Sequence, residues 1–305
     1  MPARVSVFVT DTLLPRAREI LEGFEVFESE ASDDALARCE GLICWPRQAR
    51  RELIGKMESL KMVQTMSAGV DGLDFRSLPL GVQVYSNAGA FTDSVAEHAW
   101  GILLGVAKGI QLRAKKTAPR MLRGKTLLVI GGGSIGSEVA RLSRSISMRT
   151  IGLSRSFRVP EMFDERYPLS ELPMKIGEAD AVVMALPLTK GTRGLMSYSM
   201  LLKSKPGVIV VNVGRGESVS EEGLVRWLKE RPESRYATDV FWVKKGRESF
   251  DTPAWELLNF AGTLHVSGAP LDDDLSEAKV AATRNVRRYF ETGNALNHVD
   301  PSEYV

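Results

Sequence analysis

The chain lacks the features that mark secreted, membrane-spanning or polyanion-binding proteins. Only two of its 305 residues are cysteine, too few for a disulfide framework, so we expect a reducing and therefore cytoplasmic environment. No apolar run approaches the roughly 18 residues that a membrane span needs, and residues 1–10 alternate apolar with polar side chains instead of forming a secretory signal. The 40 basic and 38 acidic residues nearly cancel, which argues against both disorder and nonspecific nucleic-acid binding. We therefore expect no membrane and no nucleic-acid partner.

What the chain does contain fits a globular protein of two domains. It is 44% hydrophobic and 26% charged, and at roughly 100–200 residues per domain its 305 residues are enough for two cores. Short apolar segments alternate with helical patterns, which is typical of an α/β fold. In the second part these segments are continuously apolar, as parallel strands covered on both faces are. They lie at residues 126–130, 150–153, 181–185, 208–212, 236–238 and 263–266.

Two long helices are expected on either side of this second series of strands. Ser94 and Glu97 have the spacing of a capping box ahead of apolar residues at helical spacing, so the first helix is expected to begin at Ser94. Apolar residues recur at helical spacing over residues 275–290, and Gly293 is placed to end that helix. Because no strand follows it, this last helix is expected to pack on the first domain.

A glycine-rich turn is the strongest single indication of a ligand. The apolar residues 127–130 run into Gly131, Gly133 and Gly136 in the spacing G-x-G-x-x-G, and a helical pattern follows. Gly131 permits the tight turn, Gly133 lets the backbone approach a pyrophosphate, and Gly136 lets the helix lie close to the strand. Backbone N–H groups at the helix start would meet the phosphate charge. A generic glycine-rich turn is the alternative, but the flanking strand and helix favour dinucleotide binding. The residues that we expect at the pyrophosphate are Gly131, Gly133, Ser134, Ile135 and Gly136.

The segment after the next strand bears on which dinucleotide is bound. A site that prefers NAD normally has Asp or Glu here to hold the ribose 2′-hydroxyl, whereas this chain has Ser154, Arg155 and Ser156. Two hydroxyls and a guanidinium suit a 2′-phosphate, because arginine binds phosphate through charge-assisted, bidentate hydrogen bonds. An exposed basic loop is the alternative. The pattern predicts that NADP is preferred and that NAD is possible.

Several blocks of the sequence resemble the D-isomer-specific 2-hydroxyacid dehydrogenase family, in particular its glyoxylate and hydroxypyruvate reductases. They occur in the family's order, span nearly the whole chain, and lie at residues 64–71, 87–89, 94–98, 131–136, 185–189, 211–216, 237–240 and 264–266. The resemblance implies a Rossmann-type parallel-sheet cofactor domain, residues 94–270, inserted into a flavodoxin-like α/β substrate domain formed by residues 1–93 and 271–305. It also implies an active site in the cleft between the two domains, and a homodimer.

The resemblance assigns roles to particular residues and assigns no metal site. The family's substrate-carboxylate cradle falls on the backbone amides of Ala68, Gly69 and Val70. Its essential arginine falls on Arg215 and its acid/base histidine on His265. The cofactor-binding positions that it adds are Leu186, Pro187, Thr192, Val213 and Asp239, the last of which contacts the nicotinamide in the family.

The two catalytic assignments agree with the chemistry of the side chains. Arg215 follows a strand at its carboxyl end, where open α/β sheets bind ligands, and a fixed cation there can hold a ketoacid carboxylate. His265 also comes at a strand end, and an imidazole can donate a proton to a carbonyl oxygen and take it back in the reverse reaction. Considered alone, Arg215 could be a surface residue of a turn and His265 a structural histidine.

One position departs from the family's pattern. The family usually has a glutamate about five residues after the position of Asp239, where it pairs with the histidine and favours its protonated form, and this chain has Lys244 there. Glu248 or Asp251 could reach the histidine from a longer loop. Alternatively, Trp242 and a backbone carbonyl could orient the imidazole, or the enzyme could be slow at neutral pH.

The combined pattern predicts an NAD(P)H-dependent oxidoreductase that interconverts a small 2-ketoacid, such as glyoxylate or hydroxypyruvate, and the D-2-hydroxyacid. Because the same fold also serves other purposes, a dinucleotide-sensing interaction protein with little turnover stays open, and formate oxidation is a less favoured third possibility. Substrate specificity is expected to depend on residues that the sequence cannot place, among them Trp45, Pro46, Met66 and Trp242, unless these only pack in the core.

Overall fold

The computed structural model describes residues 4–110, 112, 118–268 and 276–304. The chain divides into two compact units, one formed by Met1–Phe91 with Leu271–Val305 and the other by Thr92–Pro270. The domain boundary expected between residues 270 and 271 falls outside the described residues. Each unit has its own parallel sheet and its own hydrophobic core.

The first unit is a five-stranded parallel sheet with the strand order β2-β1-β3-β4-β5. Its strands are β1 (Ser6–Val9), β2 (Glu25–Glu28), β3 (Gly41–Cys44), β4 (Met62–Thr65) and β5 (Gln83–Tyr85). Its helices are α1 (Pro15–Ile20), α2 (Asp33–Arg38), α3 (Arg51–Ile54) and α9 (Ser276–Thr292). Strands β1, β3 and β4 are buried along their whole length, as strands with helices on both faces are.

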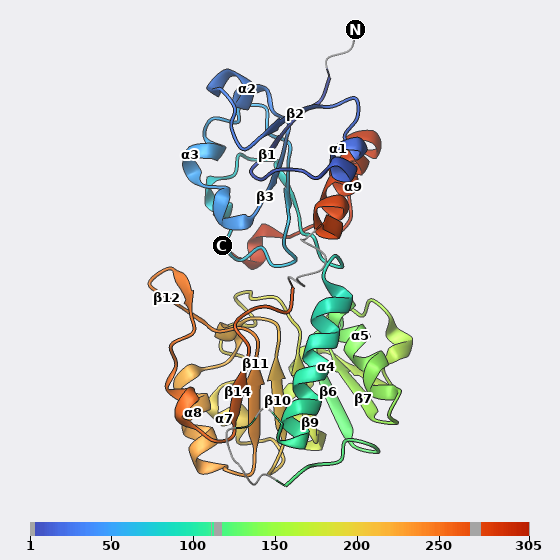
Figure 1. The fold of residues 1–305 in the computed structure, drawn as a ribbon, viewed down its shortest axis with the longest axis vertical. Coiled ribbons are helices and arrows are strands. Elements are labelled where there is room, and N and C mark those ends of the chain that lie inside the picture. The colour runs from blue at the N-terminus through green and yellow to red at the C-terminus, as the bar shows by residue number, and fades with distance from the viewer. Residues whose placement is uncertain (1–3, 111, 113–117, 269–275, 305) are drawn as a thin grey trace. The chain divides into compact units, whose positions relative to one another are not determined.

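The last helix of the chain completes this first unit. Helices α1 and α9 lie on one side of the sheet, where Leu21 and Val286 share a core with Val7, and α2 and α3 lie on the other (Figure 1). The helix α9 ends at Thr292, and Gly293 follows with a φ of 73°, the left-handed conformation of a helix C-cap. The expectations that α9 packs on the first domain and ends before Gly293 are therefore confirmed.

The second unit is a seven-stranded parallel sheet with the order β14-β11-β10-β9-β6-β7-β8. Its strands are β6 (Thr126–Ile130), β7 (Arg149–Leu153), β8 (Glu165–Tyr167), β9 (Ala181–Met184), β10 (Ile209–Asn212), β11 (Arg235–Thr238) and β14 (Phe260–Gly262). Its helices are α4 (Thr92–Lys108), α5 (Ser134–Arg144), α6 (Leu172–Lys175), α7 (Tyr198–Leu201) and α8 (Glu221–Glu230), and a hairpin of β12 (Trp242–Lys244) and β13 (Arg247–Ser249) stands apart from the sheet.

This strand order fixes where a ligand can enter. Counted along the chain from β6, the first six strands have the order 3-2-1-4-5-6 of the doubly wound dinucleotide-binding fold, with β14 added at the edge. Connections leave β6 and its neighbour β9 toward opposite sides, so a crevice opens at the carboxyl ends of these two strands. The fold class expected from the sequence, with a Rossmann-type parallel sheet, is confirmed.

Two local expectations are wrong. Helix α4 begins at Thr92, and Ser94 lies in its first turn with its hydroxyl donating to the Ser267 carbonyl instead of capping the helix. Residues 263–266 do not form a strand, because β14 ends at Gly262 and His265 has a φ of 53°, which no regular strand accommodates.

Among the described residues, every helix is too short or too polar to cross a membrane.

Candidate active site

The glycine-rich turn after β6 brings backbone groups into close contact. A Cβ on Gly136 would lie 1.9 Å from the Gly131 carbonyl oxygen, and one on Gly131, whose φ is 112°, would lie 2.4 Å from the Ala185 carbonyl oxygen. Only glycine fits at these two positions. Gly133, in contrast, has open space where its Cβ would be, and it stands immediately before α5. The first N–H groups of α5, those of Ser134 and Ile135, have no partner within the helix, so the turn fits the pyrophosphate of a dinucleotide.

The segment that follows β7 packs on this glycine-rich turn. The Arg158 N–H donates to the Gly132 carbonyl at 2.8 Å, and a Cβ on Gly132 would lie 2.5 Å from the Phe157 ring. Ser154 is half-buried, whereas Arg155 and Ser156 are exposed. The three residues expected to choose between NAD and NADP therefore lie on a segment that packs on the glycine-rich turn.

The segments after β9 and β10 lie beside the glycine-rich turn, at the carboxyl ends of adjacent strands of the second sheet. The Thr192 hydroxyl donates to the Pro187 carbonyl at 2.7 Å, which closes the turn after β9. Leu186 and Val213 are buried, and a Cβ on Gly214 would lie 2.6 Å from the Leu186 carbonyl oxygen. The expected cofactor-binding residues of these two strands are thus held next to one another.

Arg215 is held by its backbone at the carboxyl end of β10. Its carbonyl oxygen accepts hydrogen bonds from the Asn212 side chain at 2.9 Å and from the Ser218 hydroxyl at 2.7 Å. A Cβ on Gly216 would lie 2.3 Å from the Phe241 carbonyl, so the turn that carries Arg215 touches the segment after β11. The half-buried guanidinium donates to the Gly214 carbonyl at 2.8 Å, which directs a cation to this edge of the sheet.

Asp239, directly after β11, holds the loop that contains His265. Its carboxylate is buried and accepts from the Thr263 hydroxyl at 2.6 Å and from the N–H groups of Val266 at 3.0 Å and Ser267 at 3.1 Å. Burial by itself raises the pKa of Asp239, but hydrogen bonds from His98, Ser267, Thr263 and Val266 outweigh it and hold that pKa well below its usual value. The aspartate is therefore charged and binds residues 263–267 to the end of β11.

His98 belongs to this network, which the sequence did not reveal. Its Nε2 lies 2.8 Å from the Thr263 hydroxyl oxygen and 3.5 Å from the Asp239 carboxylate. Because the Thr263 hydroxyl gives its one hydrogen to Asp239, it accepts from His98, so Nε2 of His98 carries a hydrogen. His98 lies in the matching block 94–98, but its partners are about 140 and 165 residues away along the chain, and spacing alone does not bring them together.

His265 is paired with a carboxylate from the β12–β13 hairpin. Its Nδ1 lies 2.5 Å from Oε2 of Glu248, while Oε1 of Glu248 accepts from the Phe241 N–H at 2.7 Å. The His265 N–H donates to the Asp239 carbonyl at 2.8 Å, which fixes the backbone on the other side. Nδ1 thus donates to Glu248, and within the described residues Nε2 has no hydrogen-bond partner and can exchange a proton with a ligand.

This pairing bears on the structural alternatives left open by Lys244. Glu248 supplies the carboxylate, whereas the Asp251 carbonyl accepts from Lys244 at 2.6 Å. The indole N–H of Trp242 donates to the Val219 carbonyl at 2.8 Å, so Trp242 does not orient the imidazole.

The other expected substrate residues lie in the first unit. Ala68, Gly69 and Val70 form a turn just after β4, in which the Ser67 hydroxyl donates to the Gly69 carbonyl at 2.7 Å. Met66, considered for specificity, is fully buried in the core of that unit. Within the described residues, no group of three or more histidine, cysteine or acidic side chains could hold a metal ion.

Similar proteins are found by sequence over most of the chain. Residues 80–267 match the family model described as "D-isomer specific 2-hydroxyacid dehydrogenase, NAD binding domain". The glyoxylate reductase of Aeropyrum pernix is 31% identical over 312 residues, covering 92% of this chain and 91% of that protein, and the hydroxypyruvate reductase of Thermotoga maritima is 28% identical over 293 residues, covering 88% and 92%. The match to the D-3-phosphoglycerate dehydrogenase of Archaeoglobus fulgidus spans only 50% of that longer protein.

A solved structure agrees as well. A D-isomer specific 2-hydroxyacid dehydrogenase family protein from Aeromonas salmonicida superposes with a TM-score of 0.79 at 28% identity, covering 98% of this chain and 99% of that one. The family expected from the sequence blocks is confirmed by the family model and by the relatives at this coverage. The chain belongs to the D-isomer specific 2-hydroxyacid dehydrogenase family, and its second unit carries the family's NAD-binding domain.

Proposed function

We propose that this protein interconverts a small 2-ketoacid and the corresponding D-2-hydroxyacid, with glyoxylate and hydroxypyruvate as the first candidates. The observation that carries the proposal is the contact of 2.5 Å between Nδ1 of His265 and Glu248 at the carboxyl edge of the second sheet. This pair combines an imidazole with a carboxylate that holds its Nδ1 hydrogen and leaves Nε2 for the substrate, which is an arrangement that suits general acid/base catalysis at a carbonyl. Glu248 does this although Lys244 occupies the position of the family's usual glutamate.

The proton moves through His265. Glu248 accepts the hydrogen on Nδ1, and this fixes the imidazole so that Nε2 exchanges the proton. When bound, the reduced nicotinamide supplies the hydride to the carbonyl carbon of the ketoacid. Nε2 of His265 donates the proton to the carbonyl oxygen, which completes the hydroxyl group, and takes it back in the reverse reaction.

Arg215 and the turn after β4 bind the substrate carboxylate in this proposal. The guanidinium of Arg215 forms charge-assisted hydrogen bonds to the carboxylate and polarises the adjacent carbonyl. We assign carboxylate binding to the N–H groups of Ala68, Gly69 and Val70 from the family resemblance alone.

The residues at the sheet edge bind the dinucleotide. The turn of Gly131, Gly133, Ser134, Ile135 and Gly136 holds the pyrophosphate, and Leu186, Pro187, Thr192 and Val213 line the cofactor beside it. The family resemblance assigns Asp239 to the nicotinamide, and its buried carboxylate would act there through residues 263–267, which it holds. We propose that Ser154, Arg155 and Ser156 favour NADP, with NAD also bound, because no acidic side chain stands among them to hold a free ribose 2′-hydroxyl.

The resemblance to the family also supports a homodimer, and the two free cysteines support a cytoplasmic location.

The decisive experiment is NADPH oxidation measured against a panel of 2-ketoacids. We expect turnover with at least one small ketoacid, and its loss in His265→Ala. Arg215→Ala should lose ketoacid turnover while NADPH affinity, measured by fluorescence titration, stays within about a factor of two. A dinucleotide-sensing protein would instead bind NADPH and oxidise none of the panel at a measurable rate, and that result would overturn the proposal.

A further inference from the structure

The β12–β13 hairpin that carries Glu248 is too short to hold its own shape. It consists of three residue pairs, joined by Lys245 and Gly246 with φ angles of 51° and 78°. Two left-handed residues in a row are typical of the tight two-residue turn that fits a hairpin's twist. A two-stranded hairpin of this length is at best marginally stable in water, so its position depends on contacts with the rest of the unit.

The two faces of the hairpin make different contacts. Side chains alternate along a strand, so Trp242 and Lys244 point to one face while Val243 and its cross-strand partner Glu248 point to the other. On the first face, Trp242 is buried and its indole donates to Val219. The second face presents Glu248 to His265.

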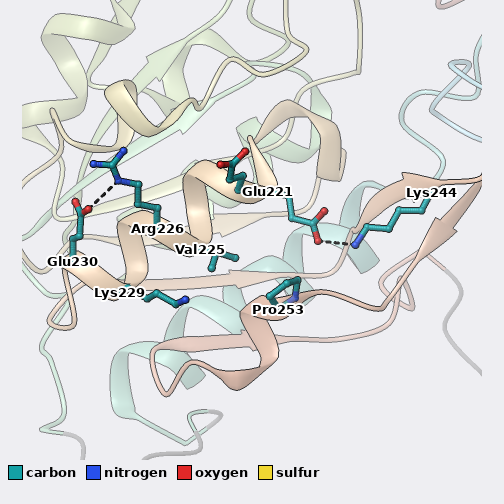
Figure 2. Close-up of a pocket in the computed structure, with 8 residues that line it drawn as sticks. Glu221, Val225, Arg226, Lys229, Glu230, Lys244 and Pro253 are labelled. Atoms are coloured by element: carbon teal, nitrogen blue, oxygen red, sulfur yellow. Dashed lines mark hydrogen bonds and ion pairs between the residues drawn. The ribbon is translucent and has the colours of Figure 1, made fainter.

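Lys244, the last residue of β12 before the turn, ties the hairpin to the rest of the unit. Its ammonium donates to the Glu221 carboxylate, at the first residue of α8, at 2.8 Å, and to the Asp251 carbonyl at 2.6 Å. Figure 2 shows this lysine reaching Glu221 at the start of α8. Both residues line an open pocket of about 560 Å³, together with Val225, Lys229 and Pro253. One side chain therefore joins the hairpin, the start of α8 and the segment after β13.

We propose that Lys244 is a positioning residue for the acid/base pair: by joining β12 to Glu221 and to the Asp251 carbonyl, it keeps the Glu248 carboxylate against Nδ1 of His265. The lysine that replaces the family's glutamate thus secures the hairpin that supplies a glutamate from another position. This inference rests on the proposed roles of His265 and Glu248.

The test follows the hydrogen bond between His265 and Glu248 itself. A hydrogen on Nδ1 that a carboxylate holds gives an NMR proton signal at the low-field end of the spectrum, because such a charge-assisted hydrogen bond is short. The Lys244→Met substitution removes neither His265 nor Glu248, so loss of this signal reports that Glu248 has moved away from Nδ1.

The experiment is proton NMR of the His265 Nδ1–H in the full-length protein, which requires no turnover. We expect the low-field signal to be lost in Glu248→Gln, which removes the carboxylate, and to be lost or strongly weakened in Lys244→Met. Lys244→Arg, which keeps the charge and the donors, should retain the wild-type signal. Lys229→Met is the matched control, because Lys229 is an exposed lysine of the same pocket and has no partner among the described residues.

A second pair of variants alters the other end of the Lys244 contact, at the start of α8. Glu221→Gln should weaken the low-field signal of His265, whereas Glu222→Gln removes the same charge one residue further along and should not. A wild-type signal in Lys244→Met, together with its loss in Glu248→Gln, would overturn the positioning role and leave the acid/base pair intact. A signal that is unchanged even in Glu248→Gln would overturn both the pair and the inference that rests on it.

Discussion

The buried carboxylate of Asp239 offers a prediction whose size follows from its contacts. In Asp239→Asn the side chain keeps only one acceptor oxygen. The carboxylate oxygen that accepts from the Ser267 N–H in the wild type is replaced by an NH₂ group, which leaves the buried Ser267 N–H without an acceptor. An unpaired buried donor costs about 1–3 kcal/mol. The bonds from Thr263 and Val266 change from a charged to a neutral acceptor, which loses roughly 1 kcal/mol each. The free energy of unfolding should therefore fall by about 3–5 kcal/mol.

The assay is denaturant unfolding followed by tryptophan fluorescence. Four of the five tryptophans, Trp100, Trp227, Trp242 and Trp255, lie in the second unit, so the signal reports mainly on the unit that contains Asp239. Asp251→Asn, which alters an exposed carboxylate, is the control and should change the free energy of unfolding by less than about 0.5 kcal/mol.

The difference in the free energy of unfolding between wild type and Asp239→Asn should also depend on pH, in a direction that the pKa of Asp239 sets. Because the folded protein lowers the pKa of Asp239, its charge stabilises the fold at every pH above the ordinary carboxyl pKa of about 3.9. This stabilisation is lost as the pH falls below that value toward the pKa in the folded protein. The difference between wild type and Asp239→Asn should be complete at pH 6 and smaller at pH 3. A difference below 1 kcal/mol at pH 6, or one that is equal at both pH values, would refute the reasoning.

Three further predictions concern the cofactor, the thiols and one close contact. Arg155→Ala should weaken NADPH binding by roughly tenfold or more, because a charged hydrogen bond to the 2′-phosphate is lost, and should leave NADH binding nearly unchanged. Parallel titrations that show an equal loss of affinity for NADPH and NADH would argue against the phosphate contact. Burial raises the pKa of Cys39 to about 11 and that of Cys44 to about 12, so Ellman's reagent should label neither thiol in the native protein at pH 8 and both after denaturation. Gly216→Ala places a Cβ 2.3 Å from the Phe241 carbonyl and should lower the melting temperature by several degrees and impair ketoacid turnover; an unchanged melting temperature would contradict that contact.

The features with a local signal in the sequence were predicted well. Continuous apolar strands and the spacing of Gly131, Gly133 and Gly136 depend on neighbouring residues, and the structure has a strand, a turn and a helix there. The prediction of a strand at residues 263–266 is wrong because the backbone of His265 is held by Asp239 and not by a neighbouring strand. The apolar residues on either side of His265 suggested a strand, but apolar content alone does not distinguish a strand from a loop that is held by side-chain contacts.

The sequence alone did not identify the partner of His265, because the partner depends on a tight hairpin turn. Glu248 was one of several alternatives, and the deciding element is the hairpin turn at Lys245 and Gly246, which reverses the chain so that Glu248 pairs with Val243. The role of His98 had no local signal, because Thr263 and Asp239 reach it only once the sheet has formed. The carboxylate-binding role of Ala68, Gly69 and Val70 was assigned from the matching block at residues 64–71 and stays a prediction.

We propose above that His265 and Glu248 form the acid/base pair of a ketoacid reductase, and the activity of Glu248→Gln is the sharpest test. The measurement is kcat for the best ketoacid with NADPH at pH 7, compared between wild type, Glu248→Gln and the control Asp251→Asn. We expect kcat in Glu248→Gln to fall at least about tenfold, because the imidazole has lost the carboxylate that holds it in place, and Asp251→Asn to keep the wild-type value. A wild-type kcat in Glu248→Gln would rule out this pair.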